Sequence, residues 1–244
     1  MIVIPMAGLS SRFLKAGYEK PKYMLVAHGE SLFSHAVNSF KQYFDSEYFL
    51  FITRDIQGTE NFVNVECQRL KIKNYCVVVL PKETMGQADT VRQGVLENAD
   101  KSEALTIFNI DTFRPGFVFP DFIDECDGYL EVFNGTGNNW SFIRVDSVDK
   151  TKVIQTTEKN AISNFCCTGL YHFKNISSFL NAYDTELRDN LENLCNGEVY
   201  VAPLYNHLIQ RGLYIRYNLI DESEVIFCGI PNEYEGFLKN AGNL

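Results

Sequence analysis

Three cations follow a run of small residues near the start of the chain. The apolar stretch Ile2–Met6 leads into the small-residue turn Ala7–Ser11, after which come Arg12, Lys20 and Lys22. Small residues let backbone N–H groups approach a phosphate closely, and hydroxyl groups add further donors. In a chain with a net charge of −9, such a local group of cations indicates a site for a polyanion. We therefore predict that this loop grips a nucleoside triphosphate.

Other patterns for phosphate binding fit this loop poorly. A dinucleotide fingerprint requires G-x-G-x-x-G, but only Gly8 fits, because Ser10 and Phe13 stand at the other glycine positions. The Walker pattern G-x-x-x-x-G-K-[ST] is absent from the loop. An ordinary turn with surface lysines is the plain alternative, and the concentration of three cations in one loop counts against it.

A second candidate segment is Pro81–Val91, which follows an apolar run. The backbone at Gly86 and the amide of Gln87 could offer donors and acceptors to a base edge. The segment could equally be the start of a helix capped by Thr84. Both interpretations are compatible, because a helix N-terminus that points into a cleft is itself an array of donors.

A carboxylate stands at the end of the next apolar run. Asp111 follows the predicted strand Ala104–Ile110, and ligands of doubly wound sheets bind at the carboxyl ends of strands. Carboxylates are ordinary Mg²⁺ ligands, so Asp111 is the leading metal and catalytic candidate. The alternative is that Asp111 only forms a turn or a helix cap.

These segments together resemble the nucleotidyltransferases that activate sugar 1-phosphates and related phospho-compounds. That family begins with an apolar strand, then A-x-G-x-G-x-R and, a short distance on, P-K; here these positions are Met6–Arg12 and Pro21-Lys22. Ser10 replaces the second glycine, which a tight loop tolerates if φ stays negative. The resemblance implies that Arg12 holds the β- and γ-phosphates, that Lys22 neutralises the α-phosphate and that Asp111 binds Mg²⁺. The nucleotide-binding residues that it implies are Met6, Ala7, Gly8, Leu9, Ser10, Ser11, Glu83, Gly86 and Gln87.

The same resemblance implies an acceptor site later in the chain. Glu158-Lys159 and Thr168-Gly169 stand where the family has its E-K and a-G-i-Y segments, so Lys159 would meet the acceptor's phosphate. The last family element, D-x-G-T-P, has Phe227 at its aspartate position. This departure leaves the second metal ligand open. Acidic residues near this position are Asp221, Glu222 and Glu224.

The expected reaction is attack by an acceptor phosphate on the α-phosphorus of the triphosphate, with release of pyrophosphate. The nucleophile is already an anion, so the absence of a His-centred catalytic pattern fits. The compact opening I-P-M-A-G-x-S-S-R-F and K-P-K-Y-M resembles nucleotidyltransferases of bacterial capsule clusters, which implies CTP as donor and L-glutamine phosphate as acceptor in capsular phosphoramidate biosynthesis. The alternatives are a sugar-1-phosphate cytidylyl- or uridylyltransferase, a non-catalytic nucleotide-binding protein and, least favoured, an NAD-dependent enzyme.

Length and composition predict one nucleotidyltransferase domain over residues 1–244, with a nucleotide-binding half at 1–125 and an acceptor-binding half at 126–244. The acidic charge argues against nucleic-acid partners, and no apolar run is long enough to cross a membrane. Seven unpatterned cysteines and the lack of a signal peptide favour the cytoplasm. The partners expected are small-molecule substrates, and a homo-oligomer is compatible with the sequence.

The elements that must position these residues alternate between strand and helix in the first half of the chain. This alternation predicts a Rossmann-like α/β fold, with a mostly parallel sheet flanked by helices. By the resemblance, the fold is of the nucleotide-diphospho-sugar transferase type. A small antiparallel extension is expected after residue ~125. Helices are predicted after a Ser31 cap, with an apolar face through Phe44, after Thr84, and along the stripe Ile176–Leu194. The predicted strands, besides Ile2–Met6 and Ala104–Ile110, are Tyr48–Thr53, Tyr75–Leu80, Gly128–Phe133, Ser141–Val145, Lys152–Thr156, Cys166–Phe173, Tyr214–Asn218 and Val225–Phe227.

Overall fold

The computed structural model describes residues 1–100 and 103–240. The chain has the predicted mixed α/β fold, with mostly parallel central strands flanked by helices. It divides into two compact units, and each unit is built from separate stretches of chain. The first unit consists of 2–83, 108–118 and the segment from 223 onward. The second unit consists of 84–107 and 119–222, together with residue 1.

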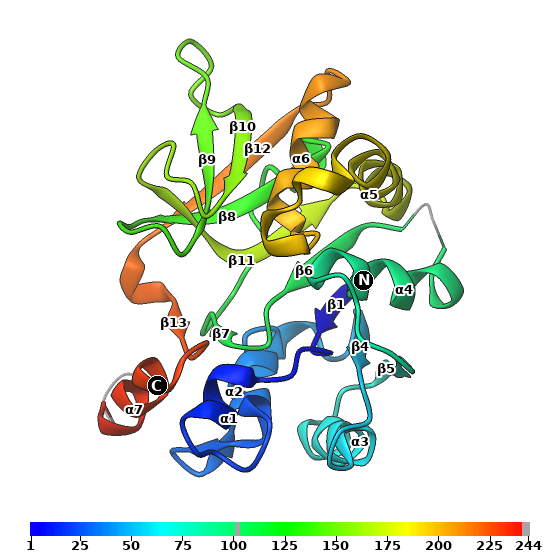
Figure 1. The fold of residues 1–244 in the computed structure, drawn as a ribbon, viewed down its shortest axis with the longest axis vertical. Helices are drawn as coiled ribbons and strands as arrows, with labels where there is room; N and C mark the ends of the chain where they lie inside the picture. The colour runs from blue at the N-terminus through cyan, green and yellow to red at the C-terminus, as the bar shows by residue number, and fades with distance from the viewer. Residues whose placement is uncertain (101–102, 241–244) are drawn as a thin grey trace. The chain divides into compact units, whose positions relative to one another are not determined.

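Parallel strands form the centre of the first unit (Figure 1). Strand β4 (Tyr48–Thr53) pairs in parallel with β1 (Ile2–Pro5) on one side and with β5 (Asn74–Val79) on the other. β1 and β4 are buried along almost their whole length, which explains why both are continuous apolar runs rather than alternating ones. The shorter strands of this unit are β2 (Val26–Ala27), β3 (Glu30–Ser31), β7 (Thr112–Phe113) and β13 (Ile226–Phe227).

The helices of the first unit are α1 (Ser11–Lys15), α2 (Leu32–Asn38), α3 (Thr59–Leu70) and α7 (Pro231–Lys239). The predicted cap of α2 is confirmed, because the Ser31 side chain accepts from the Ser34 N–H. α2 is shorter than the apolar stripe suggested, although Phe40 and Phe44 beyond its end are still buried. α1, α3 and α7 were not predicted.

The second unit carries the antiparallel part of the fold. Its strands are β6 (Leu105–Phe108), β8 (Gly128–Asn134), β9 (Ser141–Val145), β10 (Val153–Glu158), β11 (Phe165–Phe173) and β12 (Ile215–Ile220). β8 and β9 each pair antiparallel with β11, and β10 pairs antiparallel with β9. This arrangement confirms the antiparallel extension expected after residue ~125. β12 adds a parallel strand beside β8.

The helices of the second unit are α4 (Gln87–Asn98), α5 (Ile176–Asn190) and α6 (Val201–Gln210). α6 packs against both α5 and β10 (Figure 1). The stripe predicted to run to Leu194 is too long, because α5 ends at Asn190 and Leu191 beyond it is exposed. The prediction that Thr84 caps α4 is also wrong. Gly86 is the cap residue, since its positive φ breaks the helix at that point.

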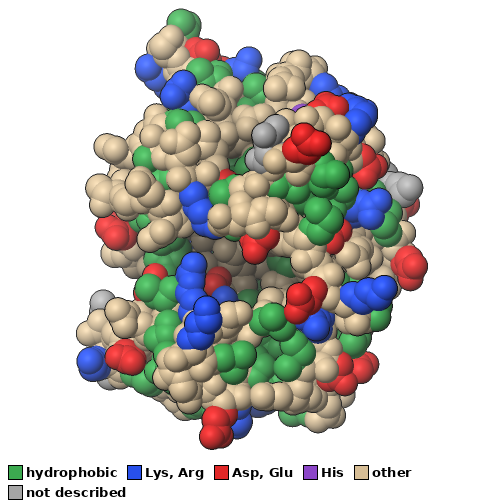
Figure 2. Space-filling model, viewed as in Figure 1, with side chains coloured by type: hydrophobic (Ala, Val, Ile, Leu, Met, Phe, Trp, Pro, Cys, Tyr) green, Lys and Arg blue, Asp and Glu red, His purple; other side chains and the backbone are tan. Residues whose placement is uncertain are grey.

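Charged side chains of both signs are interspersed over the face drawn in Figure 2, and no broad area of a single charge forms there. Within 1–100 and 103–240, no helix has the length and apolar character needed to cross a bilayer.

Candidate active site

The loop after β1 is held at its start and open in its middle. The Met6 N–H donates to the Ile52 carbonyl at 2.8 Å, which extends the β1–β4 pairing by one residue. At Gly8, a Cβ would meet no atom within 4 Å. Internal packing therefore does not require glycine at this position, and the space above the Gly8 backbone is free for a ligand to approach.

Ser10 departs from the conformation expected of it. Its φ is 53° and its ψ is 33°, so the residue that replaces the family's second glycine adopts the left-handed conformation that glycine favours. The condition that φ stays negative is not met. A hydrogen bond compensates for part of the cost, since the Ser10 hydroxyl accepts from the Lys22 N–H at 3.1 Å. This contact ties the loop to the segment that carries Lys22.

Lys22 and Asp111 meet in the first unit. Lys22 begins a single 3₁₀ turn after Pro21, and Asp111 lies three residues beyond the end of β6. The Lys22 ammonium donates to Oδ2 of Asp111, and each side chain retains 22 % exposure. The pair is therefore partly desolvated but still reachable from solvent. A cation and a carboxylate so placed can hold opposite parts of a metal-bound phosphate.

A second carboxylate lies close to Asp111. The Asp111 carbonyl accepts from the Cys228 N–H at 2.8 Å, which brings Gly229 next to the Asp111 side chain. A Cβ on Gly229 would stand 2.9 Å from Oδ2 of Asp111 and 3.6 Å from Oε2 of Glu233. The same Glu233 oxygen accepts from the N–H groups of Gly229, at 2.7 Å, and Ile230. Glycine thus leaves open a small space that both carboxylates border.

Two other positions considered for a metal ligand make different contacts. Phe227, at the family's aspartate position, pairs with Thr112 in the β7–β13 ladder. Glu224 lies near Arg114, which donates to the Glu224 carbonyl at 2.8 Å. Among the described residues, no group of three or more His, Cys, Asp or Glu side chains could hold a metal ion. At Gly229, two carboxylates, those of Asp111 and Glu233, border the same open space.

Of the remaining predicted residues of the first unit, Met6 and Ala7 are buried, whereas the charged ones are exposed. The side chain of Arg12, on α1, makes no hydrogen bond or ion pair with any residue that the structure describes. Lys20 is likewise exposed. Glu83 is paired with Arg54 at 3.1 Å on the surface, where such pairs contribute little to stability.

The segment around Gly86 is fixed by backbone contacts within the second unit. Gly86 has φ 102° and ψ −173°, a region almost exclusive to glycine. A Cβ there would stand 2.9 Å from the Val199 carbonyl oxygen. The Val199 N–H donates to the Met85 carbonyl at 2.6 Å, and its carbonyl accepts from the Ala88 N–H at 3.0 Å. Gln87 begins α4 immediately after this clamp.

Asp89 supports the same segment from inside α4. It is buried, and its carboxylate accepts from the Met85 N–H at 2.8 Å and from the Tyr183 hydroxyl at 2.9 Å. The loop that was predicted to contact the base is thus anchored on both sides.

Glu158 and Lys159, at the end of β10, point their side chains to different partners. Glu158 accepts a hydrogen bond from the Ser141 hydroxyl, and burial raises the pKa of Glu158. The Lys159 ammonium donates to the Tyr200 hydroxyl at 2.6 Å and lies 4.6 Å from the centroid of that ring. Burial, the largest single cause, lowers the pKa of Lys159, but the hydrogen bond with Tyr200 and the nearby charges, that of Glu158 among them, together outweigh it and the net shift is upward. Lys159 therefore stays charged.

Thr168 and Gly169 lie in an irregular part of β11. The pairing of β11 with β8 shifts register between Cys167 and Tyr171, and Gly169 has φ 99°. Thr168 is buried, and its hydroxyl donates to the carboxylate of the fully buried Glu131 at 3.1 Å. The Thr168 side chain is thus committed to an internal contact.

The comparison with solved structures decides the family. The crystal structure of the nucleoside-diphosphate-sugar pyrophosphorylase from Vibrio cholerae RC9 matches this chain with a TM-score of 0.94 and 54% sequence identity, over 98% of this chain and 100% of that one. The chain belongs to the nucleoside-diphosphate-sugar pyrophosphorylases. It is accordingly a nucleotidyltransferase.

Two more distant structures share the fold of this pyrophosphorylase family. The inositol-1-phosphate CTP transferase from T. maritima matches with a TM-score of 0.74 and 14% identity, over 100% of this chain and 97% of that one. The UDP-glucose pyrophosphorylase from Acinetobacter baumannii matches with a TM-score of 0.71 and 14% identity, over 99% and 92%. No protein-family model matches the chain. No curated protein matches it either.

Sequence reasoning missed three contact residues in this pyrophosphorylase: Glu233, Val199 and Tyr200. Glu233 stands four residues after Gly229 and two residues after Pro231, where the matched D-x-G-T-P region ends, so its charge was a signal that could have been weighed. Val199 and Tyr200 carry no such signal. Tyr200 contacts Lys159, more than forty positions away along the chain, and Val199 contacts Met85, more than a hundred positions away.

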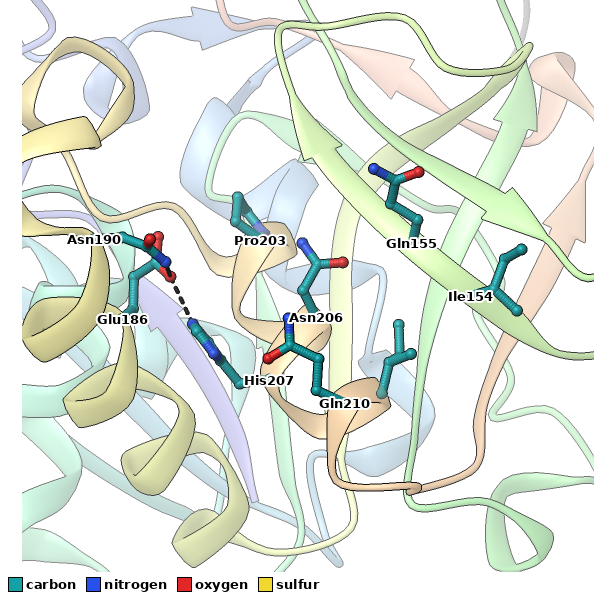
Figure 3. Close-up of a pocket in the computed structure, with 9 residues that line it drawn as sticks. Ile154, Gln155, Glu186, Asn190, Pro203, Asn206, His207 and Gln210 are labelled. Carbon is teal, nitrogen blue, oxygen red and sulfur yellow. Dashed lines mark hydrogen bonds and ion pairs between the residues drawn. The ribbon is translucent and has the colours of Figure 1, made fainter.

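A separate pocket of about 420 Å³ lies in the second unit of the pyrophosphorylase (Figure 3). α5, α6 and β10 line it, largely with amide side chains such as Gln155 and Asn190. Its charged members are paired with each other, because His207 Nε2 lies 2.6 Å from Oε2 of Glu186. None of the predicted site residues lines this pocket.

Proposed function

We propose that the protein transfers CMP from CTP to a phosphorylated small molecule, L-glutamine phosphate, and releases pyrophosphate, as a CTP:phosphoglutamine cytidylyltransferase of capsule modification. The observation that carries nucleotidyl transfer is the ion pair of Lys22 and Asp111, which is tied by Ser10 to the open loop at Gly8. The choice of CTP and of this acceptor rests on the resemblance of the opening segments. The fold shared with a CTP transferase agrees with it.

Each cation has a distinct role in this proposal. The Arg12 guanidinium, on an exposed residue and without a partner among the described residues, binds the β- and γ-phosphates. Lys22 exchanges its contact with Asp111 for one with the α-phosphate, and the backbone from Met6 to Ser11 lines the triphosphate. Because the difficulty of the reaction is the meeting of two polyanions, fixed positive charge lowers the barrier and holds the reactants in line.

The chemical step needs no general base. An oxygen of the acceptor phosphate attacks the α-phosphorus, and a new P–O bond forms. The bond from the α-phosphorus to the oxygen that bridges to the β-phosphate breaks, and pyrophosphate leaves with that electron pair. The acceptor oxygen is already ionised at neutral pH, so no proton has to be removed. The Lys159 ammonium binds the acceptor phosphate, and the segment at Gly86 and Gln87 contacts the base.

The first unit offers ligands that suit Mg²⁺. Asp111 and Glu233 border one open space at Gly229, and both are oxygen donors of the kind that Mg²⁺ prefers. Mg²⁺ is commonly held by one or two carboxylates, with substrate phosphates and water as the other ligands, so this donor set fits. When bound, the ion would neutralise charge on the phosphates of the donor.

The test is a comparison of nucleotides followed by an assay of turnover. The thermal midpoint of the protein is measured with Mg²⁺ and, in turn, CTP, UTP, ATP, GTP and dTTP. A ligand at ~100 times its Kd stabilises by about 2.7 kcal/mol, and we expect the largest shift with CTP. Pyrophosphate release is then measured with CTP and L-glutamine phosphate. Stabilisation by no triphosphate, or binding of CTP without turnover of any acceptor, would contradict the proposal.

A sugar 1-phosphate is the second candidate acceptor. The observation in its favour is the 54% identity to a protein described as a nucleoside-diphosphate-sugar pyrophosphorylase. Glucose 1-phosphate with UTP, dTTP and CTP is therefore assayed in parallel. Release of pyrophosphate with a sugar 1-phosphate and not with L-glutamine phosphate would assign the protein to this second function.

A further inference from the structure

Tyr200 makes the direct contact that holds the Lys159 ammonium. Its hydroxyl accepts a hydrogen bond from Nζ at 2.6 Å, and its ring lies under the same ammonium at 4.6 Å. Burial and the nearby Glu198 carboxylate raise the pKa of Tyr200, whereas the hydrogen bond with Lys159 lowers it. The Tyr200 hydroxyl and ring thus both contact the same ammonium. A long, flexible lysine side chain is thereby confined to one direction.

The backbone of Lys159 is also constrained. Lys159 has φ 53°, the left-handed conformation that is uncommon for a residue with a side chain. Its N–H donates to the Trp140 carbonyl at 2.9 Å, which holds it at the end of β10. Strained backbone conformations persist where surrounding contacts over-determine them. Here both ends of the residue, its backbone and its ammonium, are held.

The elements that carry the two residues are locked together. The Asn206 amide of α6 pairs with the backbone of Thr156 in β10, accepting from its N–H and donating to its carbonyl, each at 2.9 Å. The Thr156 hydroxyl donates to the Ala202 carbonyl at 2.6 Å. Tyr200 directly precedes α6 and Lys159 directly follows β10, so these bonds set their separation. Asn206 is one of the residues drawn in Figure 3.

The residue before Tyr200 belongs to the clamp on the Gly86 segment. Val199 is buried and bonds the backbone on both sides of that glycine, at Met85 and Ala88. One short segment, Glu198–Tyr200, therefore contacts both the predicted base loop and the predicted acceptor lysine. The contacts differ in kind, because Val199 acts through its backbone whereas Tyr200 acts through its side chain.

We propose that Tyr200 is a positioning residue that aims the Lys159 ammonium at the phosphate of the acceptor. This inference rests on the function proposed above, in which Lys159 meets that phosphate. Because the hydroxyl of Tyr200 touches Lys159 and not the base loop, its removal weakens acceptor binding and leaves nucleotide binding unchanged.

The experiment is a double-mutant cycle on the full chain. Wild type, Tyr200→Phe, Lys159→Met and the double variant are assayed with CTP and the best acceptor among L-glutamine phosphate, glucose 1-phosphate and inositol 1-phosphate. Loss of a hydrogen bond to a charged group corresponds to about a ten-fold rise in the acceptor KM for Tyr200→Phe. We expect no change in the KM for CTP, and no added effect of Tyr200→Phe once Lys159 is Met.

Tyr217→Phe is the matched control, since its hydroxyl donates at 3.1 Å to the exposed Lys150 carbonyl, away from Lys159. Thermal midpoints identify any variant that fails to fold. If Tyr200→Phe fails to fold, Tyr200→Trp replaces it, because tryptophan keeps a large ring but changes the polar group. The role of Tyr200 is overturned if Tyr200→Phe leaves the acceptor KM unchanged, or if it changes this KM equally in the wild-type protein and in Lys159→Met. Either result leaves the proposed function in place. A wild-type protein that turns over no acceptor overturns the proposed function, and this inference with it.

Discussion

The ammonium of Lys22 donates a hydrogen bond to the carboxylate of Asp111, which lies 89 residues later in the chain. Each group is the other's partner in the absence of ligand, and each retains 22 % exposure. A metal-bound triphosphate would offer each of the two groups a better partner. The metal cation would meet the carboxylate, and a phosphate would meet the ammonium. In the function proposed here, the pair exchanges this mutual contact for contacts with substrate.

Replacement of Lys22 tests this directly. We expect Lys22→Ala to lower kcat/KM for nucleotidyl transfer by about 10²- to 10³-fold, because a fixed charge at the reacting phosphate is lost. The fold should survive, since solvent screens the partly exposed Asp111 carboxylate. The readouts are pyrophosphate release and the thermal midpoint. Lys20→Ala is the matched control, an exposed cation of the same loop, and an equal loss of turnover in both variants would remove Lys22 from its assigned role.

Glu233→Gln separates the charge of Glu233 from its structural contacts. The amide oxygen of glutamine can still accept from the N–H groups of Gly229 and Ile230, so the thermal midpoint should stay near that of wild type. The negative charge beside Asp111 is lost, and we expect the Mg²⁺ concentration for half-maximal activity to rise about ten-fold. Mn²⁺ binding in the presence of CTP, followed by electron paramagnetic resonance, gives a readout without turnover. Glu235→Gln, on the same helix, is the control; identical Mn²⁺ affinities in both variants would rule out a metal role.

Gly86→Ala should weaken both the fold and nucleotide binding. Alanine is strained at φ 102°, and its Cβ would stand 2.9 Å from the Val199 carbonyl. We expect a loss of about 1–3 kcal/mol in the free energy of unfolding, measured in urea, and a higher KM for CTP. Gly236→Ala in α7 is the contrasting control, because a Cβ there meets nothing within 4 Å and should stabilise the helix. A Gly86→Ala protein as stable as wild type would show that the clamp yields easily.

Ser10 combines an unfavourable backbone conformation with a favourable hydrogen bond. Ser10→Gly removes a conformational cost of about 1 kcal/mol and a hydrogen bond of about 1 kcal/mol, so its thermal midpoint should match that of wild type. Ser10→Ala loses the bond and keeps the cost, and it should be the less stable of the two. Both variants free the Lys22 segment and should raise the KM for CTP. An alanine variant more stable than the glycine variant would disprove the conformational argument.

His172 should make the stability of the protein depend on pH. Burial lowers the pKa of His172 to about 3, from an ordinary value of about 6.5. Between these values the unfolded chain binds a proton that the native protein does not, so stability is present above about pH 6.5 and is lost as the pH falls. The loss at about pH 5 is about 2 kcal/mol relative to pH 8.

His172→Gln provides the comparison, because glutamine does not titrate and can still bond the Thr106 hydroxyl, which lies 2.9 Å from His172 Nδ1. Urea unfolding of both proteins at pH 5, 6, 7 and 8 should give a shallower slope for the variant. Parallel pH profiles would mean that other groups account for the acid sensitivity.

The sequence predicted the strands well where burial dominates. β4 and β9 have the predicted bounds, because a strand buried within a sheet must be apolar along its length or on one face. Helix ends were less predictable. α4 begins three residues after Thr84 because the backbone at Gly86 is shaped by Val199, a residue distant in sequence. α7, with few apolar residues to form a stripe, had no periodic pattern by which to recognise it.

Motifs in the sequence alone determined the candidate chemistry: a small-residue loop with Arg12 and Lys22, and a carboxylate at Asp111 after a buried strand. These features are local, since a few consecutive residues are enough to determine a phosphate-binding turn or the end of a strand. Only the tertiary structure decided that Lys22 meets Asp111, that Glu233 borders the same space, and that Tyr200 holds Lys159. Such contacts join residues whose separation along the chain carries no pattern, and packing of the fold is what brings them within hydrogen-bonding distance.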